Sequence, residues 1–240
     1  MDLQIFWFIT LAVLFTGFLV LEGFDFGVGM LMAPLGRSAR RVGGDPDKHR
    51  RAVLNTIGPV WDGNEVWLIT AGGAMFAAFP GMYATMFSGL YLPLLAILFS
   101  MIVRICAIEW RGKVDDPHWR RWADIGIAVG SWVPAVLWGV AFAALVRGLP
   151  VDADHQIDLG FADILNPYTL LGGLSTCGLF LLHGAVFITL KTEGAVRADA
   201  RRFAARLAVP VTVVLATFGL WTQLSYGTDW TWLVLGAAVV

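Results

Sequence analysis

Six long apolar stretches and the start of a seventh decide what this chain can fold into. A run of about 20 apolar residues matches the hydrocarbon thickness of a bilayer, and only a helix satisfies its own backbone groups in lipid without a closed barrel. Hydrophobic residues make up 58% of the 240 and charged residues 15%, compared with roughly half and a quarter in soluble domains. We therefore predict an all-α, polytopic transmembrane bundle that forms one domain over residues 1–240. The expected spans are 3–34, 52–79, 83–105, 123–146, 167–190, 207–225 and an incomplete 230–240.

The basic residues predict how these spans are oriented. All 17 Lys and Arg lie in or beside the connections, with six in 36–51, five in 104–121 and five in 191–206. The remaining one, Arg147, lies at the start of the 147–167 connection. Because cytoplasmic loops of membrane proteins carry the excess of Lys and Arg, these three connections are expected inside and the N-terminus outside. The acidic 147–167 connection then belongs on the outer side.

The two ends of the chain also carry information. The first apolar stretch has no basic segment before it, is longer than the core of a signal peptide and contains acids, so we do not expect it to be cleaved. The final run, Trp230–Val240, has eleven residues and is too short to cross a bilayer. We expect further helices beyond residue 240.

Each of the first two spans contains a pair of carboxylates that should be costly in lipid. The pairs are Glu22 with Asp25, and Asp62 with Glu65. A carboxylate at membrane depth costs at least ~2.5–3.5 kcal/mol, so such groups normally face a bundle interior or a wet cavity. The i, i+3 spacing puts each pair on one helix face. Asp25 lies ten residues before Leu35 and Asp62 ten residues after Ala52, so both are expected about 15 Å from the same membrane surface. Acid pairs at matched depth predict a proton path.

Cysteine and histidine offer little metal or redox chemistry. Cys106 and Cys177 form no CxxC motif, so neither a disulfide nor a metal cluster is expected. His183 is the one histidine within a span. A haem inside a bundle takes axial His or Met ligands from facing helices, so His183 could supply at most one, and packing is the more ordinary role. We expect no catalytic residue, no metal ligand and no haem on this chain itself.

Two motifs on the first two spans resemble a known family. They are Gly23–Met30 (Gly-Phe-Asp-Phe-Gly-Val-Gly-Met) and Pro59–Leu68 (Pro-Val-Trp-Asp-Gly-Asn-Glu-Val-Trp-Leu), followed by Gly72–Pro80. Their sequence and order are similar to subunit II of the cytochrome bd-type quinol oxidases. The resemblance continues more loosely through Arg104, the Trp119–Asp124 region and Leu165–Pro167, so it covers essentially the whole chain.

The resemblance implies a respiratory function in the bacterial plasma membrane. Such oxidases oxidise membrane quinol and reduce oxygen to water. It implies that haems b and d and the quinol site lie on a partner, subunit I, and that this haem-free subunit supplies a proton route from the cytoplasm. Asp62 and Asp25 would then be relay groups, with Glu65 and Glu22 in support. Small accessory subunits, membrane lipids, quinol and a structural quinone are further expected partners, and nucleic acid is not. Whether the donor is ubiquinol or menaquinol stays open.

The same residues also fit other roles. The acids could be purely structural, with Arg104 near the inner end of the third span pairing with Asp62, or Arg104 could contact a haem propionate across the subunit interface. Gly23 and Gly27 fit a helix-packing face. Trp61 and Trp67 lie on opposite sides of the second span, where one could line a quinone or lipid groove.

Two other function classes also fit intramembrane acids in part. A proton-coupled secondary transporter needs buried acids, but it typically shows internal repeats and paired broken helices, which this sequence does not clearly contain. A purely scaffolding subunit needs no acids at matched depth.

Overall fold

The computed structural model describes residues 2–40, 43–153, 157 and 164–239, and the elements in these residues are helices. They are α1 (Leu3–Ala39), α2 (Pro46–Leu54), α3 (Trp61–Ala78), α4 (Pro80–Gly89), α5 (Tyr91–Trp110), α6 (Pro117–Arg147), α8 (Pro167–Lys191), α9 (Gly194–Tyr226) and α10 (Thr231–Val239).

Five of these helices are long and apolar enough to cross a membrane: α1, α5, α6, α8 and α9. Their most apolar segments have mean hydropathies of 1.7–2.2. This confirms the predicted class, a polytopic helical bundle. The helix α3 has 18 residues, but Asp62, Asn64 and Glu65 in its first two turns reduce its apolar character. The number of crossings and their orientation remain predictions.

The second predicted span differs from the observed helices. The expected helix over 52–79 is interrupted, because α2 ends at Leu54 and α3 begins only at Trp61. Gly58 and Pro59 lie in the turns between them. Proline lacks the N–H that a helix needs and clashes with the preceding turn, which explains the break.

The third predicted span is also two helices. The expected 83–105 segment is covered by α4 and α5, which meet at Leu90, and α5 continues to Trp110. The sixth span begins earlier than predicted, at Gly194 rather than residue 207, because the basic segment before it is helical as well.

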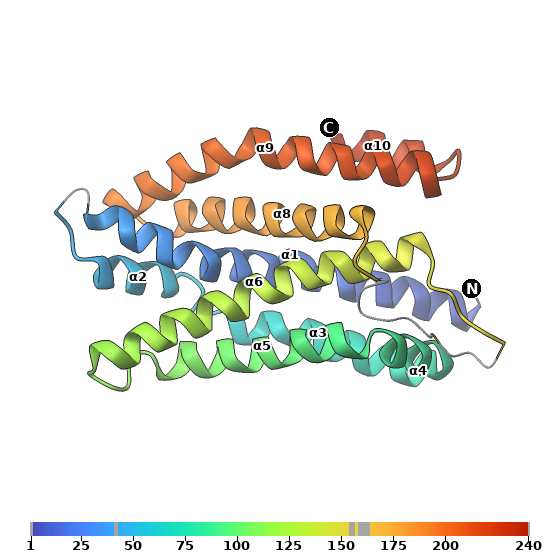
Figure 1. Ribbon diagram of the computed structural model, residues 1–240, viewed down its shortest axis with the longest axis horizontal. Coiled ribbons are helices and arrows are strands. Elements are labelled where there is room, and N and C mark those ends of the chain that lie inside the picture. The colour runs from blue at the N-terminus through green and yellow to red at the C-terminus, as the bar shows by residue number, and fades with distance from the viewer. Residues whose placement is uncertain (1, 41–42, 154–156, 158–163, 240) are drawn as a thin grey trace.

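The helix α1 runs through the middle of the bundle and packs against α8, α3, α2 and α6 (Figure 1). α5 packs on α6, and α9 packs on α8 at one edge of the molecule. The N-terminus lies at one end, on the right in Figure 1, and the α1–α2, α5–α6 and α8–α9 connections lie at the other. The three basic connections therefore share one end. This agrees with the prediction that they lie on the same side of the membrane.

Glycine brings α1 and α8 into close contact. A Cβ on Gly27 would overlap the carbonyl oxygen of Phe180 and lie 2.8 Å from the Cα of Gly184. Gly23, one turn earlier, faces the ring of Phe180. Small residues at this spacing let two helix backbones approach closely in a membrane. The predicted packing face of Gly23 and Gly27 is thus the contact with α8.

Candidate functional site: a buried cluster of charged residues

The functional candidate is built around Arg104 on α5, which is fully buried. Its Nη1 donates hydrogen bonds to Glu22 Oε1 on α1 at 2.5 Å and to Glu65 Oε1 on α3 at 3.3 Å. The guanidinium also lies 5.0 Å from the ring centroid of Phe26. One arginine therefore joins three helices through two carboxylates. A buried charge of this kind needs such partners to offset its loss of water.

The position of Arg104 depends on a glycine of the neighbouring helix. Gly130 on α6 packs directly against Arg104, and a Cβ there would overlap the Cβ of Arg104 and lie 2.5 Å from the carbonyl oxygen of Ser100. This lets α5 lie close against α6, while the long arginine side chain extends to α1 and α3.

Asp25 is the second buried carboxylate of α1, and its partner is an amide. Asn64 Nδ2 on α3 donates a 2.7 Å hydrogen bond to Asp25 Oδ2, and both residues are buried. Asn64 belongs to the Pro59–Leu68 motif, but only charged residues were predicted as members of the site. A usable signal was present, because an amide beside an acid in an apolar helix also needs a buried polar partner.

Asp62 lies apart from this cluster. It is exposed in the first turn of α3, and in the described part of the chain the carboxylate partners of Arg104 are Glu22 and Glu65. The hypothesis that Arg104 pairs with Asp62 is therefore wrong. It assumed an unbroken helix from residue 52. Because α3 begins at Trp61, it is Asn64 and Glu65 that meet α1 at the level of Asp25 and Glu22.

Several polar atoms in the cluster have no protein partner. Among the described residues, Glu22 Oε2, Asp25 Oδ1, and Arg104 Nε and Nη2 are buried without a hydrogen bond. Most buried polar atoms in proteins are satisfied by protein or by ordered water. These four atoms lie on the three residues that join α1 to α3 and α5, so the cluster has unused donors and acceptors.

The other candidate residues contribute to packing. Trp61 and Trp67 are half-buried: Trp61 packs on the apolar cluster that includes Phe24 and Val53, and Trp67 lies over Gly17 of α1. The ring of His183 stands edge-to-face with Phe24 at 5.5 Å between centroids. The quinone or lipid groove suggested for the tryptophans remains a prediction.

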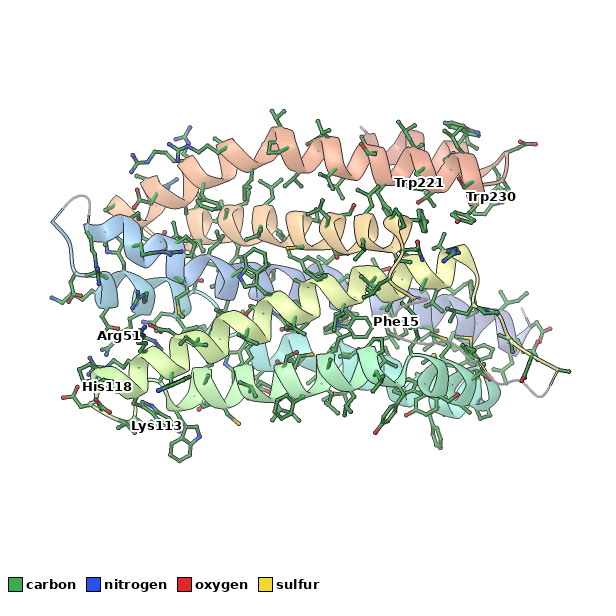
Figure 2. The ribbon with its side chains drawn as sticks, in the orientation of Figure 1. Phe15, Arg51, Lys113, His118, Trp221 and Trp230 are labelled. Atoms are coloured by element: carbon green, nitrogen blue, oxygen red, sulfur yellow. The ribbon has the colours of Figure 1, made fainter. Side chains whose placement is uncertain are left out.

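A second ionic network lies at the end that carries the basic connections. Arg111 Nε donates to Asp124 Oδ1 and its Nη2 to Asp47 Oδ1, both at 2.6 Å. Arg50 Nη1 donates to Asp124 Oδ2 at 3.0 Å. The network joins α2 to α6 and to the end of α5, and it was not predicted from the sequence. Figure 2 shows side chains from these segments, with Arg51, Lys113 and His118 labelled near this end.

Burial and charge act in opposite directions on Asp47. Burial acts to raise the pKa of its carboxyl group, but the hydrogen bond from Arg111 and the charges of Arg111, Arg120 and Arg51 lower this pKa below its ordinary value overall. For Arg111, burial acts to lower the pKa, and the bonds to Asp124 and Asp47 outweigh it and raise the pKa. Each partner thus favours the charged form of the other.

Fold and site together define a multi-pass membrane protein with a cluster of charged residues inside its helical bundle. The family model described as cytochrome bd terminal oxidase subunit II matches residues 3–240. The chain belongs to this family.

Bacterial relatives agree with this family. The chain is 45% identical over 223 residues to the cytochrome bd ubiquinol oxidase subunit 2 of Bacillus subtilis (strain 168). The matched residues make up 93% of this chain and 63% of that protein. The chain is 40% identical over 231 residues to the cytochrome bd-I ubiquinol oxidase subunit 2 of Escherichia coli (strain K12), with 95% and 58% covered. The chain therefore spans about three-fifths of the length of these relatives.

Proposed function

We propose that this chain forms part of the haem-free subunit II of a quinol-oxidising, oxygen-reducing complex. The names of its relatives, which are ubiquinol oxidase subunits, support this role. In this proposal the chain packs against a haem-bearing subunit I in the bacterial plasma membrane. Reduction of oxygen to water consumes protons, and this subunit conducts them from the cytoplasmic side.

The residues of this chain support haems b and d on the partner. A haem in a bundle needs axial His or Met ligands, and His183, the one histidine in a predicted span, packs its ring against Phe24. The described residues also contain no group of three or more His, Cys, Asp or Glu suited to a metal ion. When bound to the partner, the haems supply the electron transfer and the oxygen chemistry. This chain contributes positioned acids.

The observation that carries the proton route is that Glu22 and Glu65 share the Nη1 of Arg104. Because both carboxylates contact the same guanidinium nitrogen, they lie near each other. Asp25 lies on the same helix face as Glu22, one turn away. Asp62, at the start of α3 and nearer the basic end, is proposed as the entry group.

Water completes this route in our proposal. The unpartnered atoms of Glu22, Asp25 and Arg104 are the kind of buried polar groups that ordered water normally satisfies. A water bound to these atoms would add a hydrogen-bonded path for a proton between Glu22 and Asp25.

The test is substitution of the acids in the assembled complex. Asp25→Asn keeps the size of the side chain and an oxygen that accepts from Asn64, but it removes the titrating group. We expect oxygen consumption to fall about a hundredfold, the lower range for a lost proton-transfer group, at unchanged haem content. Asp62→Asn should behave similarly, and Glu22→Gln less severely. Proton uptake from the cytoplasmic side of proteoliposomes should slow in parallel.

The matched control is Glu109→Gln, which removes an exposed carboxylate paired with Lys113 outside the cluster and should leave turnover unchanged. Normal turnover in assembled Asp25→Asn and Asp62→Asn complexes would contradict the proton route. Loss of haem in these variants would instead favour a structural role for the acids. If a tag on this chain purifies no haem-bearing partner, the oxidase role fails and a proton-coupled transporter becomes the better hypothesis.

A further inference from the structure

The first turns of α9 form a basic surface that the proton route does not use. Five Lys and Arg lie in 191–206. Four of them lie on α9, and they are Arg197, Arg201, Arg202 and Arg206. All four side chains are exposed. Figure 1 shows α9 along one edge of the molecule, with α8 on its inner side.

These arginines differ from the basic residues in 104–121 in how they are paired. Four of the five basic residues in 104–121 have a carboxylate partner, namely Arg104, Arg111, Lys113 and Arg120. On α9, Arg202 pairs with Asp199, whose buried carboxylate also accepts from Ser38 of α1. Among the described ion pairs none includes Arg197, Arg201 or Arg206. The surface therefore carries positive charge that the described part of the chain does not neutralise.

The same surface is hollowed. A cavity of about 420 Å³ is lined by Gly194, Arg197, Ala198, Arg201, Arg202 and Ala205. This volume lies within the roughly 300–1,000 Å³ of small-ligand sites. Arg197 and Arg201, four residues apart, are neighbours on one face of α9.

An apolar stripe continues from this hollow along the helix. Ala205, Val209 and Val213 follow Arg201 at four-residue spacing on α9. Val209 and Val213 are 71% and 58% exposed. A ligand that fits this surface has an anionic group at one end and a hydrocarbon chain at the other.

We propose that the basic end of α9 binds the phosphodiester headgroup of an anionic phospholipid, with an acyl chain along Val209 and Val213. Arg197 and Arg201 are the headgroup ligands. Arginine suits this task because its planar guanidinium donates in pairs to phosphate oxygens. The predicted cytoplasmic position agrees, since the cytoplasmic leaflet carries the anionic lipids that attract basic segments beside a span. The inference does not depend on the oxidase role.

The experiment is native mass spectrometry of the full-length protein, with the subunits that copurify, after delipidation and titration with dioleoylphosphatidylglycerol or dioleoylphosphatidylcholine. We expect the wild type to prefer the anionic lipid. Arg197→Gln/Arg201→Gln should lower its apparent affinity about thirtyfold, the effect of two basic residues near an anionic surface. Arg147→Gln removes an exposed arginine at the opposite end and should bind as the wild type does.

Two further variants separate binding from folding and headgroup from chain. Arg197→Lys/Arg201→Lys keeps the charge and should retain most of the binding. Val209→Gln should weaken binding of the lipid while the arginines stay in place. Equal binding of the two lipids, unchanged affinity in the Gln double variant, or equally effective displacement by inorganic phosphate would each overturn the proposal. So would a wild type that binds neither lipid, as expected if another protein segment covers this face.

Discussion

At the scale of single residues, the buried site depends on Arg104. Its Nη1 contacts both Glu22 and Glu65, and its side chain is fully buried. Removing one member of a buried ion pair leaves an uncompensated charge and typically costs about 3–5 kcal/mol. The carboxylates that conduct protons in our proposal therefore rely on the positive charge of Arg104.

We expect Arg104→Gln to lower the thermal stability and the yield of the complex strongly, because Glu22 and Glu65 lose their counter-charge. Glu22→Gln/Arg104→Gln should recover part of the loss, since it removes one of the two unpaired charges. Arg121→Gln, at an exposed arginine of α6, is the control. Thermal unfolding in detergent measures the effect. Additive losses in the double variant would mean that the pair is not coupled.

Asp47 should make the stability of the protein depend on pH. Its lowered pKa in the folded state means that its pairing stabilises the protein above the pKa of the unfolded chain, about 3.9. This contribution is lost as the pH falls through the folded-state pKa. We expect Asp47→Asn to be less stable than the wild type at pH 7, by up to about 1 kcal/mol for a half-exposed pair. The difference in thermal unfolding should shrink as the pH is lowered below about 3.9. A difference that is independent of pH would assign the effect to packing.

At the scale of elements, the contact between α1 and α8 holds the acid-bearing helix in place. Gly27 and Gly184 allow the two backbones to approach closely. Asp25 lies two residues before Gly27 on the same helix, and Glu22 lies five residues before it. Any change that separates α1 from α8 should therefore also disturb the site.

We expect Gly27→Ala to destabilise the protein by about 1–3 kcal/mol, the usual cost of overpacking, because the new methyl group would overlap the backbone of α8. Gly73→Ala is the matched control: a Cβ at this helical position of α3 meets nothing within 4 Å in the described part, so it should be neutral or slightly stabilising. Thermal unfolding compares the two. Equal effects would contradict the close α1–α8 contact.

At the scale of the whole molecule, the basic residues distinguish one end of the bundle from the other. The three basic connections share one end in Figure 1, which agrees with a common cytoplasmic side. In a Cys106→Ser background, which removes an exposed thiol, we expect Lys113→Cys to react with an impermeant maleimide only in inverted vesicles. Val151→Cys should react only in right-side-out vesicles. The reverse pattern would invert the topology and, with it, the side from which protons enter.

Much of this architecture follows from the sequence by itself. Long apolar stretches have to form helices in lipid because no water is available to backbone groups, and acids inside them have to face a protein interior. This is why the helical bundle and the buried character of Glu22 and Asp25 were predictable, whereas the second and third predicted spans are each divided between two helices. The motifs around Asp25 and Asp62 were also long enough to indicate the family.

The tertiary structure alone decided which polar groups meet. Arg104 is 82 residues from Glu22 and 39 from Glu65, and no sequence pattern relates such distant positions. The pairing depends on where α3 begins after Gly58-Pro59 and on how closely Gly130 lets α5 approach α6. The break at Pro59 moves the start of α3 by nine residues relative to the predicted span. As a result Glu65, rather than Asp62, reaches the arginine, and Asn64 becomes the partner of Asp25. A contact between helices depends on their register and separation, which the side chains of all the packed helices determine together.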